Sequence, residues 1–434
     1  MILTSANVCS NLRARQHAGG GGSTIVERTL PRRIAHFDLD TFFVAVERAR
    51  DPSLIGKPVL VGGRGGRGVV AAASYESREY GCHSAQPMSV ALRLCPHAVV
   101  VSPDRHEYVR VSRLFHDMLR DASPIVESVG IDEAYVDFTG AGAETSAARA
   151  LAEDIRARVR SELHIAVSVC IAGSRTTAKV GSDRAKPDGL IEVPVGGDAA
   201  FLASVPIREL PMVGPRFADA LATAGVHTIG DAARLDPRWL EASFGRQGVV
   251  LHDHANGRDA TPVIGGGRPN RSISREVTFD RDVTDRRKLK RTLARHAQSV
   301  GADLRRAGKR ARTVTLKLRW DNFETPTRSR TLDRPVQSTA GLLEPAEAML
   351  DELLVGRPRP VRLIGLGATN LVDDELQLGL DDLLEAPDHR LGGELREDRI
   401  DETLDSIRSR FGDSAVSRGL DPPRGPATLH RPQN

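Results

Sequence analysis

Two short acidic motifs are spaced so that their carboxylates could surround metal ions. Asp38 and Asp40 end the apolar run at residues 34–37, which predicts a strand, and side chains two apart on a strand share a face. Asp132 and Glu133 are adjacent just before another predicted strand, so they can converge only where the backbone turns, as at a hairpin tip. Carboxylates gathered in this way suit two Mg²⁺ ions about 4 Å apart, the arrangement used in phosphoryl transfer.

Each motif also has an ordinary explanation. An acidic residue at the end of a strand often faces water. Asp40 could instead be the N-cap of the helix that the apolar spacing of Phe42, Val46 and Ala49 predicts. Spacing alone therefore leaves the catalytic role open.

The elements that would position these motifs mix strands and helices as far as residue 196. We expect strands at residues 58–61, 69–73, 134–138 and 165–172, and helices at 109–120 and 146–162. Residues 197–262 are mostly helical in pattern, and the Gly- and Pro-rich stretch 263–270 predicts a domain boundary. Strands and long helices follow it, and a final helix is expected at 401–411.

Basic charge is concentrated after this boundary. The chain of 434 residues has a net charge of +4, but residues 268–334 hold 20 Lys and Arg against 8 Asp and Glu, a net +12, which leaves −8 for the remainder. In the predicted strand 313–320, apolar side chains form one face, whereas Thr313, Thr315, Lys317 and Arg319 form the other. Such a face suits a duplex backbone, and the alternative is a face of solvated charge.

Other features limit the class of protein. The four cysteines form no C-x-x-C pair, which argues against a structural zinc site and a disulfide framework. No apolar run approaches the roughly 18 residues of a membrane span, so a soluble, cytoplasmic protein without membrane contact is expected. Residues 1–31 have the composition of a disordered leader, and the end of the chain is Pro-rich.

Taken together in chain order, four motifs resemble those of the Y-family translesion DNA polymerases, most closely the bacterial DNA polymerase IV branch. The resemblance extends from about residue 32 to residue 380, and the combination is far more specific than any single motif. The motifs are His36-Phe37-Asp38-Leu39-Asp40-Thr41-Phe42-Phe43, Ala73-Ser74-Tyr75-Glu76-Ser77-Arg78, Ile131-Asp132-Glu133-Ala134-Tyr135 and Ala185-Lys186-Pro187-Asp188-Gly189.

The resemblance implies a template-directed DNA polymerase that adds deoxynucleotides to a primer 3′ end by two-metal phosphoryl transfer, in error-prone translesion synthesis during DNA repair. Asp38, Asp132 and Glu133 would hold two Mg²⁺ ions, with the Leu39 carbonyl joining one of them. Asp40 would be structural. The family often has threonine at Ala72 and serine at Gly130, departures that remove no metal ligand.

The same resemblance assigns Tyr75, Arg78 and Lys186 to the incoming nucleotide and Phe43 to the steric gate that excludes a ribose 2′-hydroxyl. From the residues alone, Tyr75 would be a packing residue and Arg78 a solvated one. Because adjacent helical residues cannot share a face, Phe42 is the better core residue and Phe43 is free to meet the sugar. A second core aromatic at Phe43 is the alternative.

Other resemblances concern DNA and protein partners. Residues 210–215 resemble a helix-hairpin-helix turn, although Met212 replaces its first glycine. The basic segment resembles the family's little finger, so Arg275, Lys317 and Arg319 are expected to contact DNA. The run Gln377-Leu378-Gly379-Leu380 resembles the start of a sliding-clamp peptide, with Asp381 where an aromatic residue is common. The alternative for this run is an ordinary exit from a strand.

We therefore expect an α+β right-handed polymerase, active as a monomer on primer–template DNA and deoxynucleoside triphosphates and able to use a sliding clamp. The expected division is a leader at 1–31, a palm at 32–41 and 106–196, fingers at 42–105, a thumb at 197–262, a linker at 263–270, a little finger at 271–376 and a tail at 377–434. Two alternatives are a catalytically silent DNA-binding paralogue, acting as a scaffold at stalled forks, and a nucleotide cyclase. A cyclase would not need the basic domain.

Overall fold

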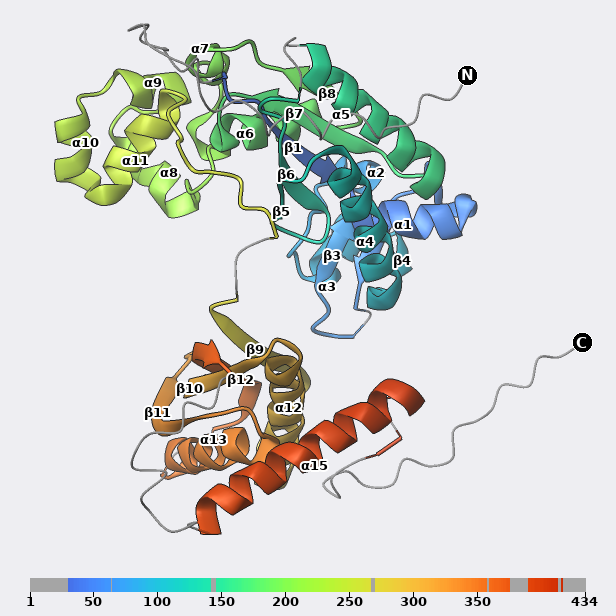
Figure 1. Ribbon diagram of the computed structural model, residues 1–434, viewed down its shortest axis with the longest axis vertical. Coiled ribbons are helices and arrows are strands. Elements are labelled where there is room, and N and C mark those ends of the chain that lie inside the picture. The colour runs from blue at the N-terminus through green and yellow to red at the C-terminus, as the bar shows by residue number, and fades with distance from the viewer. Residues whose placement is uncertain are drawn as a thin grey trace, which may run out of the picture.

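A computed structural model describes residues 30–63, 65–141, 146–266, 270–356, 359–374, 389–412 and 415–416 (Figure 1). The expected leader, apart from residues 30 and 31, lies outside the described residues, and so does the clamp-like run Gln377-Leu378-Gly379-Leu380. Within the described part of the chain, no helix is long and apolar enough to cross a membrane.

A five-stranded sheet organises the first half of the chain. The strand order is β5-β6-β1-β7-β8, with β1 at the centre and antiparallel to both neighbours, while β7 and β8 run parallel. The strands are β1 (Ile34–Leu39), β5 (Val126–Ser128), β6 (Glu133–Asp137), β7 (Val167–Ala172) and β8 (Leu190–Glu192). The strands expected here are present, and their ends differ by one or two residues.

The two faces of β1 have different neighbours. Ala35, Phe37 and Leu39 face a large apolar core that also takes side chains from α4 (Arg105–Ala122) and α5 (Ser146–Arg158). His36 and Asp38 lie on the opposite face, toward α6 (Arg175–Ala185). The period-two alternation of a strand thus separates the core from the polar site on a single segment.

A smaller three-stranded sheet, in the order β3-β2-β4, lies beside the first one (Figure 1). Its strands are β2 (Val59–Gly62), β3 (Val70–Ala73) and β4 (Val99–Val101), and the chain here also forms α1 (Phe42–Arg50), the 3-10 turn η1 (Pro52–Leu54), α2 (Tyr75–Arg78) and α3 (Met88–Leu94). The sheet has its own core, which includes Leu60 and Met88.

A helical unit follows the first sheet, as the sequence pattern predicts. Its elements are α7 (Asp198–Leu202), η3 (Ile207–Glu209), α8 (Pro215–Thr223), α9 (Ile229–Arg234), α10 (Pro237–Phe244) and α11 (Arg246–Ala255). Leu202, Leu221, Leu240 and Leu251 lie in its core. Asp259, just beyond α11, accepts hydrogen bonds from the backbone N–H and hydroxyl of Thr176, and these bonds join the unit to α6.

The C-terminal unit is a four-stranded antiparallel sheet, in the order β11-β10-β12-β9, with α12 and α13 packed on one face (Figure 1). Its elements are β9 (Ser272–Val283), α12 (Arg286–Arg306), β10 (Lys309–Trp320), β11 (Thr327–Val336), α13 (Thr339–Leu354) and β12 (Val361–Asp373). The apolar side chains of β10 are buried as expected, and Lys317 and Arg319 alternate with them. Thr313 is an exception to the expected open face, because Thr331 and Asn370 cover it and leave it buried.

A last helix, α15 (His389–Phe411), packs against α12 and α13 and begins earlier than the predicted start at Asp401. Ion pairs connect α15 to the rest of the C-terminal unit. Arg305 of α12 contacts Asp401 and Asp405, and Arg310 of β10 contacts Asp398. The region expected to be a tail therefore includes a docked helix.

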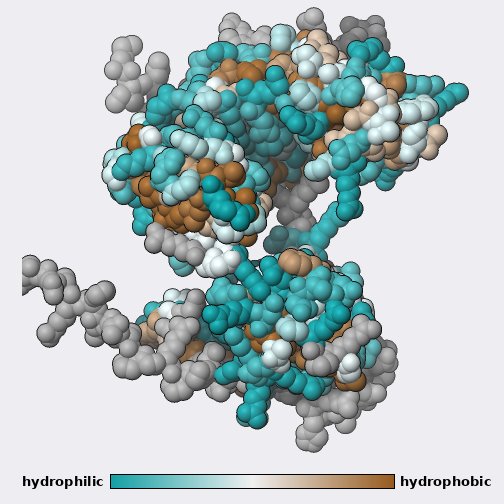
Figure 2. Space-filling view, turned by 180° about the vertical axis from the view of Figure 1, so that it is seen from behind, coloured by the Kyte–Doolittle hydropathy of each residue, from teal (hydrophilic) through white to brown (hydrophobic). Residues whose placement is uncertain are grey.

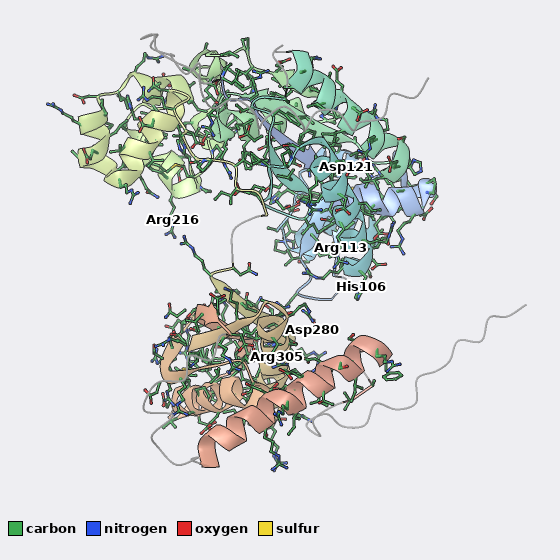
Figure 3. All side chains as sticks on the ribbon, in the orientation of Figure 1. His106, Arg113, Asp121, Arg216, Asp280 and Arg305 are labelled. Atoms are coloured by element: carbon green, nitrogen blue, oxygen red, sulfur yellow. The ribbon has the colours of Figure 1, made fainter. Side chains whose placement is uncertain are left out.

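The two bodies of the molecule also meet away from the linker. The loop between β2 and β3 reaches β9, where Arg67 donates hydrogen bonds to the Phe279 carbonyl at 2.8 Å and to Asp282 Oδ1 at 2.7 Å. Figure 3 labels Asp280 at this contact, and the space-filling view in Figure 2 shows a narrow waist between the two bodies.

Candidate active site

The hairpin formed by β5 and β6 brings the two acidic motifs together. Asp38 is the Cα partner of Glu133 in the β1–β6 ladder, and the Leu39 N–H donates to the Asp132 carbonyl at 2.9 Å. At the turn, the N–H groups of Val129 and Gly130 donate to the Glu133 carbonyl at 3.2 and 3.3 Å. The expected hairpin tip is therefore present, and it directs both acidic residues toward the end of β1.

The carboxylates are close enough to affect one another. Burial raises the pKa of Asp132, and the nearby negative charges of Asp38 and Glu133 raise it further. Ligand atoms of His36, Asp38 and Glu133 lie within 4.8 Å of one another. Carboxylate oxygens gathered in this way, from a buried Asp38 and a partly buried Asp132 and Glu133, are the donors that Mg²⁺ prefers, so the residues present fit the ions that the sequence predicts.

Two lysines neutralise this cluster. Lys179 Nζ lies 3.1 Å from Asp38 Oδ2 and 2.6 Å from Glu133 Oε2, and Lys186 Nζ lies 2.9 Å from Asp38 Oδ1. Burial alone would lower the pKa of Lys186, but the charge and hydrogen bond of Asp38, together with the charge of Asp183, outweigh burial and raise the pKa. Sequence reasoning found Lys186 and missed Lys179. The spacing of Lys179, Asp183 and Lys186 at i, i+4 and i+7 was a signal that could have found it.

His36 is another residue that sequence reasoning missed. It is fully buried, its Nδ1 lies 2.8 Å from Ser182 Oγ, and its Nε2 lies 3.5 Å from Glu133 Oε2. Burial, followed by the charge of Lys179, lowers the pKa of His36 well below its usual value. The imidazole is therefore neutral at physiological pH and adds no positive charge to the cluster.

Asp40 has a structural role, but it is not the predicted N-cap. Thr41 occupies the N-cap position of α1, and no side chain caps this helix. Asp40 is buried and accepts hydrogen bonds from Ser168 Oγ at 2.9 Å and from the Asp188 N–H at 2.6 Å. It thus ties β1 to β7 and to the loop that carries Lys186.

The two adjacent phenylalanines divide as the helical pattern predicts. Phe42 is only 3% exposed and belongs to the core, whereas Phe43 is partly exposed. The ring of Phe43 stacks on that of Tyr108 from α4, with centroids 4.3 Å apart and planes 13° apart, and the Tyr108 hydroxyl donates to Glu47 Oε1 at 2.7 Å. Tyr108 was not expected at the site, because it is far from Phe43 in the sequence and no local pattern predicts their contact.

Tyr75 and Arg78 are the first and last residues of the short helix α2. The Arg78 guanidinium is 5.2 Å from the centre of the Tyr75 ring, and its Nε donates to the Ala73 carbonyl at 3.1 Å. Burial and the charge of Asp40 raise the pKa of Tyr75, so its hydroxyl stays protonated. Tyr75 also lines a cavity of about 530 Å³, together with Thr41 and Pro187.

The residues expected to contact DNA lie on the sheet of the C-terminal unit and carry local partners. Arg275 pairs with Asp303, Lys317 Nζ lies 2.9 Å from Glu276 Oε2, and Arg319 Nε donates to Thr325 Oγ1 at 2.9 Å. These contacts are partly exposed, so a phosphate could compete for the same donors.

The helix-hairpin-helix-like turn contains an unusual backbone conformation. Met212 has a φ of 76°, in the left-handed region that favours glycine, and it is 41% exposed. The side chain is therefore outside the core of the helical unit. Arg216 lies at the start of α8, just after this turn, and Figure 3 shows its side chain extending toward the C-terminal unit.

Comparison with known proteins agrees with this geometry. Residues 37–183 match the impB/mucB/samB family, and residues 270–380 match the C-terminal domain of that family. DNA polymerase IV of Dehalococcoides mccartyi strain CBDB1 is 37% identical over 389 residues, which cover 89% of this chain and 97% of the relative. DNA polymerase IV of Methanoculleus marisnigri is 44% identical over 339 residues, or 77% and 93% of the two chains.

Solved structures show the same fold. A Y-family DNA polymerase chimera of Dbh and Dpo4 superposes with a TM-score of 0.71 at 25% identity, covering 79% of this chain and 99% of the chimera. An insertion ternary complex of Dbh DNA polymerase gives a TM-score of 0.59 with the same identity and coverage.

The fold and these likenesses define a DNA-directed DNA polymerase of the α+β class, with a little-finger domain at its C-terminal end, that carries out translesion synthesis. The chain belongs to the Y-family of DNA polymerases, in its DNA polymerase IV group.

Proposed function

We propose that this polymerase joins deoxynucleotides to a primer 3′ end by a two-metal mechanism, with Asp38, Asp132 and Glu133 as the metal-holding side chains. The observation that carries the proposal is the convergence of these carboxylates at the β5–β6 turn. When bound, two Mg²⁺ ions would lower the pKa of the primer hydroxyl and neutralise charge on the phosphates. The Leu39 carbonyl is the fourth proposed ligand.

The other side chains position the nucleotide. We assign Lys186, Tyr75 and Arg78 to the triphosphate, because an ammonium, a protonated hydroxyl and a guanidinium each donate to phosphate oxygens. We assign Phe43 to the steric gate, since its ring is held flat against Tyr108 and is partly exposed. A rigid ring supported in this way would leave no room for a 2′-hydroxyl.

The domain roles follow from the same proposal. The five-stranded sheet would be the palm, the three-stranded sheet the fingers and the α7–α11 unit the thumb. Arg275, Lys317 and Arg319 would grip the duplex backbone without reading sequence. We further propose that the enzyme works as a cytoplasmic monomer in DNA repair and uses Gln377, Leu378 and Leu380 to bind a sliding clamp. Clamp pull-downs with Gln377→Ala and Leu380→Ala test the last point.

Primer extension on plain and damaged templates tests the central proposal. Asp132→Asn should slow extension by at least about a thousandfold, because each ligand to a catalytic ion supplies several kcal/mol of charge stabilisation. Asp117→Asn, which alters an exposed carboxylate on α4, is the matched control and should extend normally. Extension by Asp132→Asn at the wild-type rate would refute the ligand assignment. A wild-type chain that binds DNA but extends nothing with any divalent metal would support the silent-paralogue alternative.

A further inference from the structure

Helix α6 presents a row of charged side chains to the carboxylate cluster. Lys179 and Asp183 are four residues apart, and Lys186 follows three residues later at the C-cap, so all three share one face. Lys179 is the one that contacts both strands of the cluster. Its ammonium contacts Asp38 Oδ2 at 3.1 Å and Glu133 Oε2 at 2.6 Å, and it thus bridges two of the proposed metal ligands.

This ammonium sits on oxygen atoms that a divalent cation would also use. Both cations carry positive charge and both need the same carboxylate oxygens, so their binding must be mutually unfavourable. The side chain of Asp38 is only 8% exposed, and water therefore screens this competition weakly. Without a cation, the neighbouring carboxylates of Asp38, Asp132 and Glu133 would repel one another, and Lys179 reduces that repulsion.

A second carboxylate is placed to receive the lysine. Asp183 Oδ1 lies 3.6 Å from Lys179 Nζ and 3.3 Å from Lys186 Nζ, and its side chain is 48% exposed. A lysine has a flexible four-carbon stem and a compact charge, so a small rotation could exchange one carboxylate partner for another. Asp183 can therefore keep the ammonium paired after it leaves Asp38 and Glu133.

We propose that Lys179 is a positioning residue, an exchangeable counter-cation that holds Asp38 and Glu133 together before a divalent ion binds and then passes to Asp183. The affinity of the site for metal is set by this exchange. The inference rests on the proposed metal site and adds to it a residue that controls when the site is occupied.

The test is a calorimetric titration of the full-length protein with Mn²⁺ alone, in the absence of DNA and nucleotide. Lys179→Met removes the competing charge and should tighten Mn²⁺ binding by about tenfold, a modest part of what one unit charge at this range can exert. Asp183→Asn removes the receiving carboxylate and should weaken binding several-fold. Lys290→Met is the matched control, because Lys290 also bridges two carboxylates, Glu347 at 3.3 Å and Asp351 at 3.0 Å, but in the little finger.

The double variant separates exchange from a general effect of charge. If Asp183 acts through the lysine, the effect of Asp183→Asn should shrink in the Lys179→Met background, because contacting residues are not additive. The role of Lys179 would be overturned if both variants kept wild-type circular dichroism and bound Mn²⁺ with wild-type affinity. The proposed metal site itself would be unaffected by that result. A wild-type chain that binds no Mn²⁺ would overturn the proposed function itself. Should Lys179→Met fail to fold, Lys179→Gln takes its place in the same pair of single and double variants.

Discussion

The backbone at Met212 leads to a prediction about stability. The turn has Pro211 followed by Met212 at φ 76°, and the Val213 N–H donates to the Leu210 carbonyl at 3.0 Å, a pattern typical of a type II turn with glycine at its third position. A side chain in the left-handed region costs about 1–2 kcal/mol. Glycine would remove that cost but would add about 0.4–1 kcal/mol of unfolded-state freedom. The balance predicts that Met212→Gly stabilises the α7–α11 helical unit by roughly 0.5–1 kcal/mol.

The chain offers a specific probe for this measurement. It has two tryptophans, Trp239 in α10 of the helical unit and Trp320 in β10 of the little finger. A Trp320→Phe background therefore leaves fluorescence that reports on the helical unit. Because the protein has several domains, its global unfolding is not two-state, and a local reporter is needed. The urea midpoint of the Trp239 transition should rise by roughly 0.5 M in Met212→Gly.

The control for this prediction is Met212→Ala. Alanine shortens the side chain but keeps Cβ, so it keeps the left-handed strain and should not raise the midpoint. Since Met212 is 41% exposed, the packing lost in either variant is small. A Met212→Gly protein no more stable than Met212→Ala would refute the argument from strain.

Three further predictions follow from the site and its surroundings. Phe43→Val should raise incorporation of ribonucleotides relative to deoxynucleotides in single-turnover assays, and unchanged discrimination would exclude the gate. Lys317→Ala should reduce the slope of log affinity for duplex DNA against log salt by about one, with little dependence on sequence. Burial would raise the pKa of Asp259, but hydrogen bonds from Thr261 and Thr176 outweigh it and lower the pKa. The ionised Asp259 carboxylate stabilises the fold at pH values above its pKa in the unfolded chain, and this stabilisation is lost as the pH falls through its pKa in the folded protein. Asp259→Asn should therefore make the melting temperature fall less steeply with decreasing pH.

Local patterns predicted much of this molecule. The two faces of β1 follow from strand periodicity, so the separation of Phe37 from Asp38 could be foreseen. The division between Phe42 and Phe43 follows from helical periodicity in the same way. The turn at Asp132 and Glu133 was foreseen because adjacent strand residues cannot otherwise converge.

What could not be foreseen depends on contacts between distant segments. Asp40 looked like a helix cap, since a short acidic residue before a helix usually is one, but Ser168 and Asp188 reach it across the sheet. Lys179 bridges the carboxylates only because α6 packs over β1 and β7, next to the strand that carries Glu133. The pairing of Arg67 with Asp282 likewise joins a loop to a strand more than two hundred residues away, and no local pattern carries that information.

The docked helix α15 means that the unit of homology and the unit of folding differ at the C-terminal end. The match to the family's C-terminal domain stops at residue 380, yet Arg305, whose side chain is 8% exposed, reaches past that point to Asp401 and Asp405. A fragment that ends where the match ends would keep this guanidinium beside α12 and α13 but lack both carboxylates. Breaking a buried ion pair by removing one partner typically costs about 3–5 kcal/mol. A recombinant little finger that is meant to fold should therefore extend through Phe411.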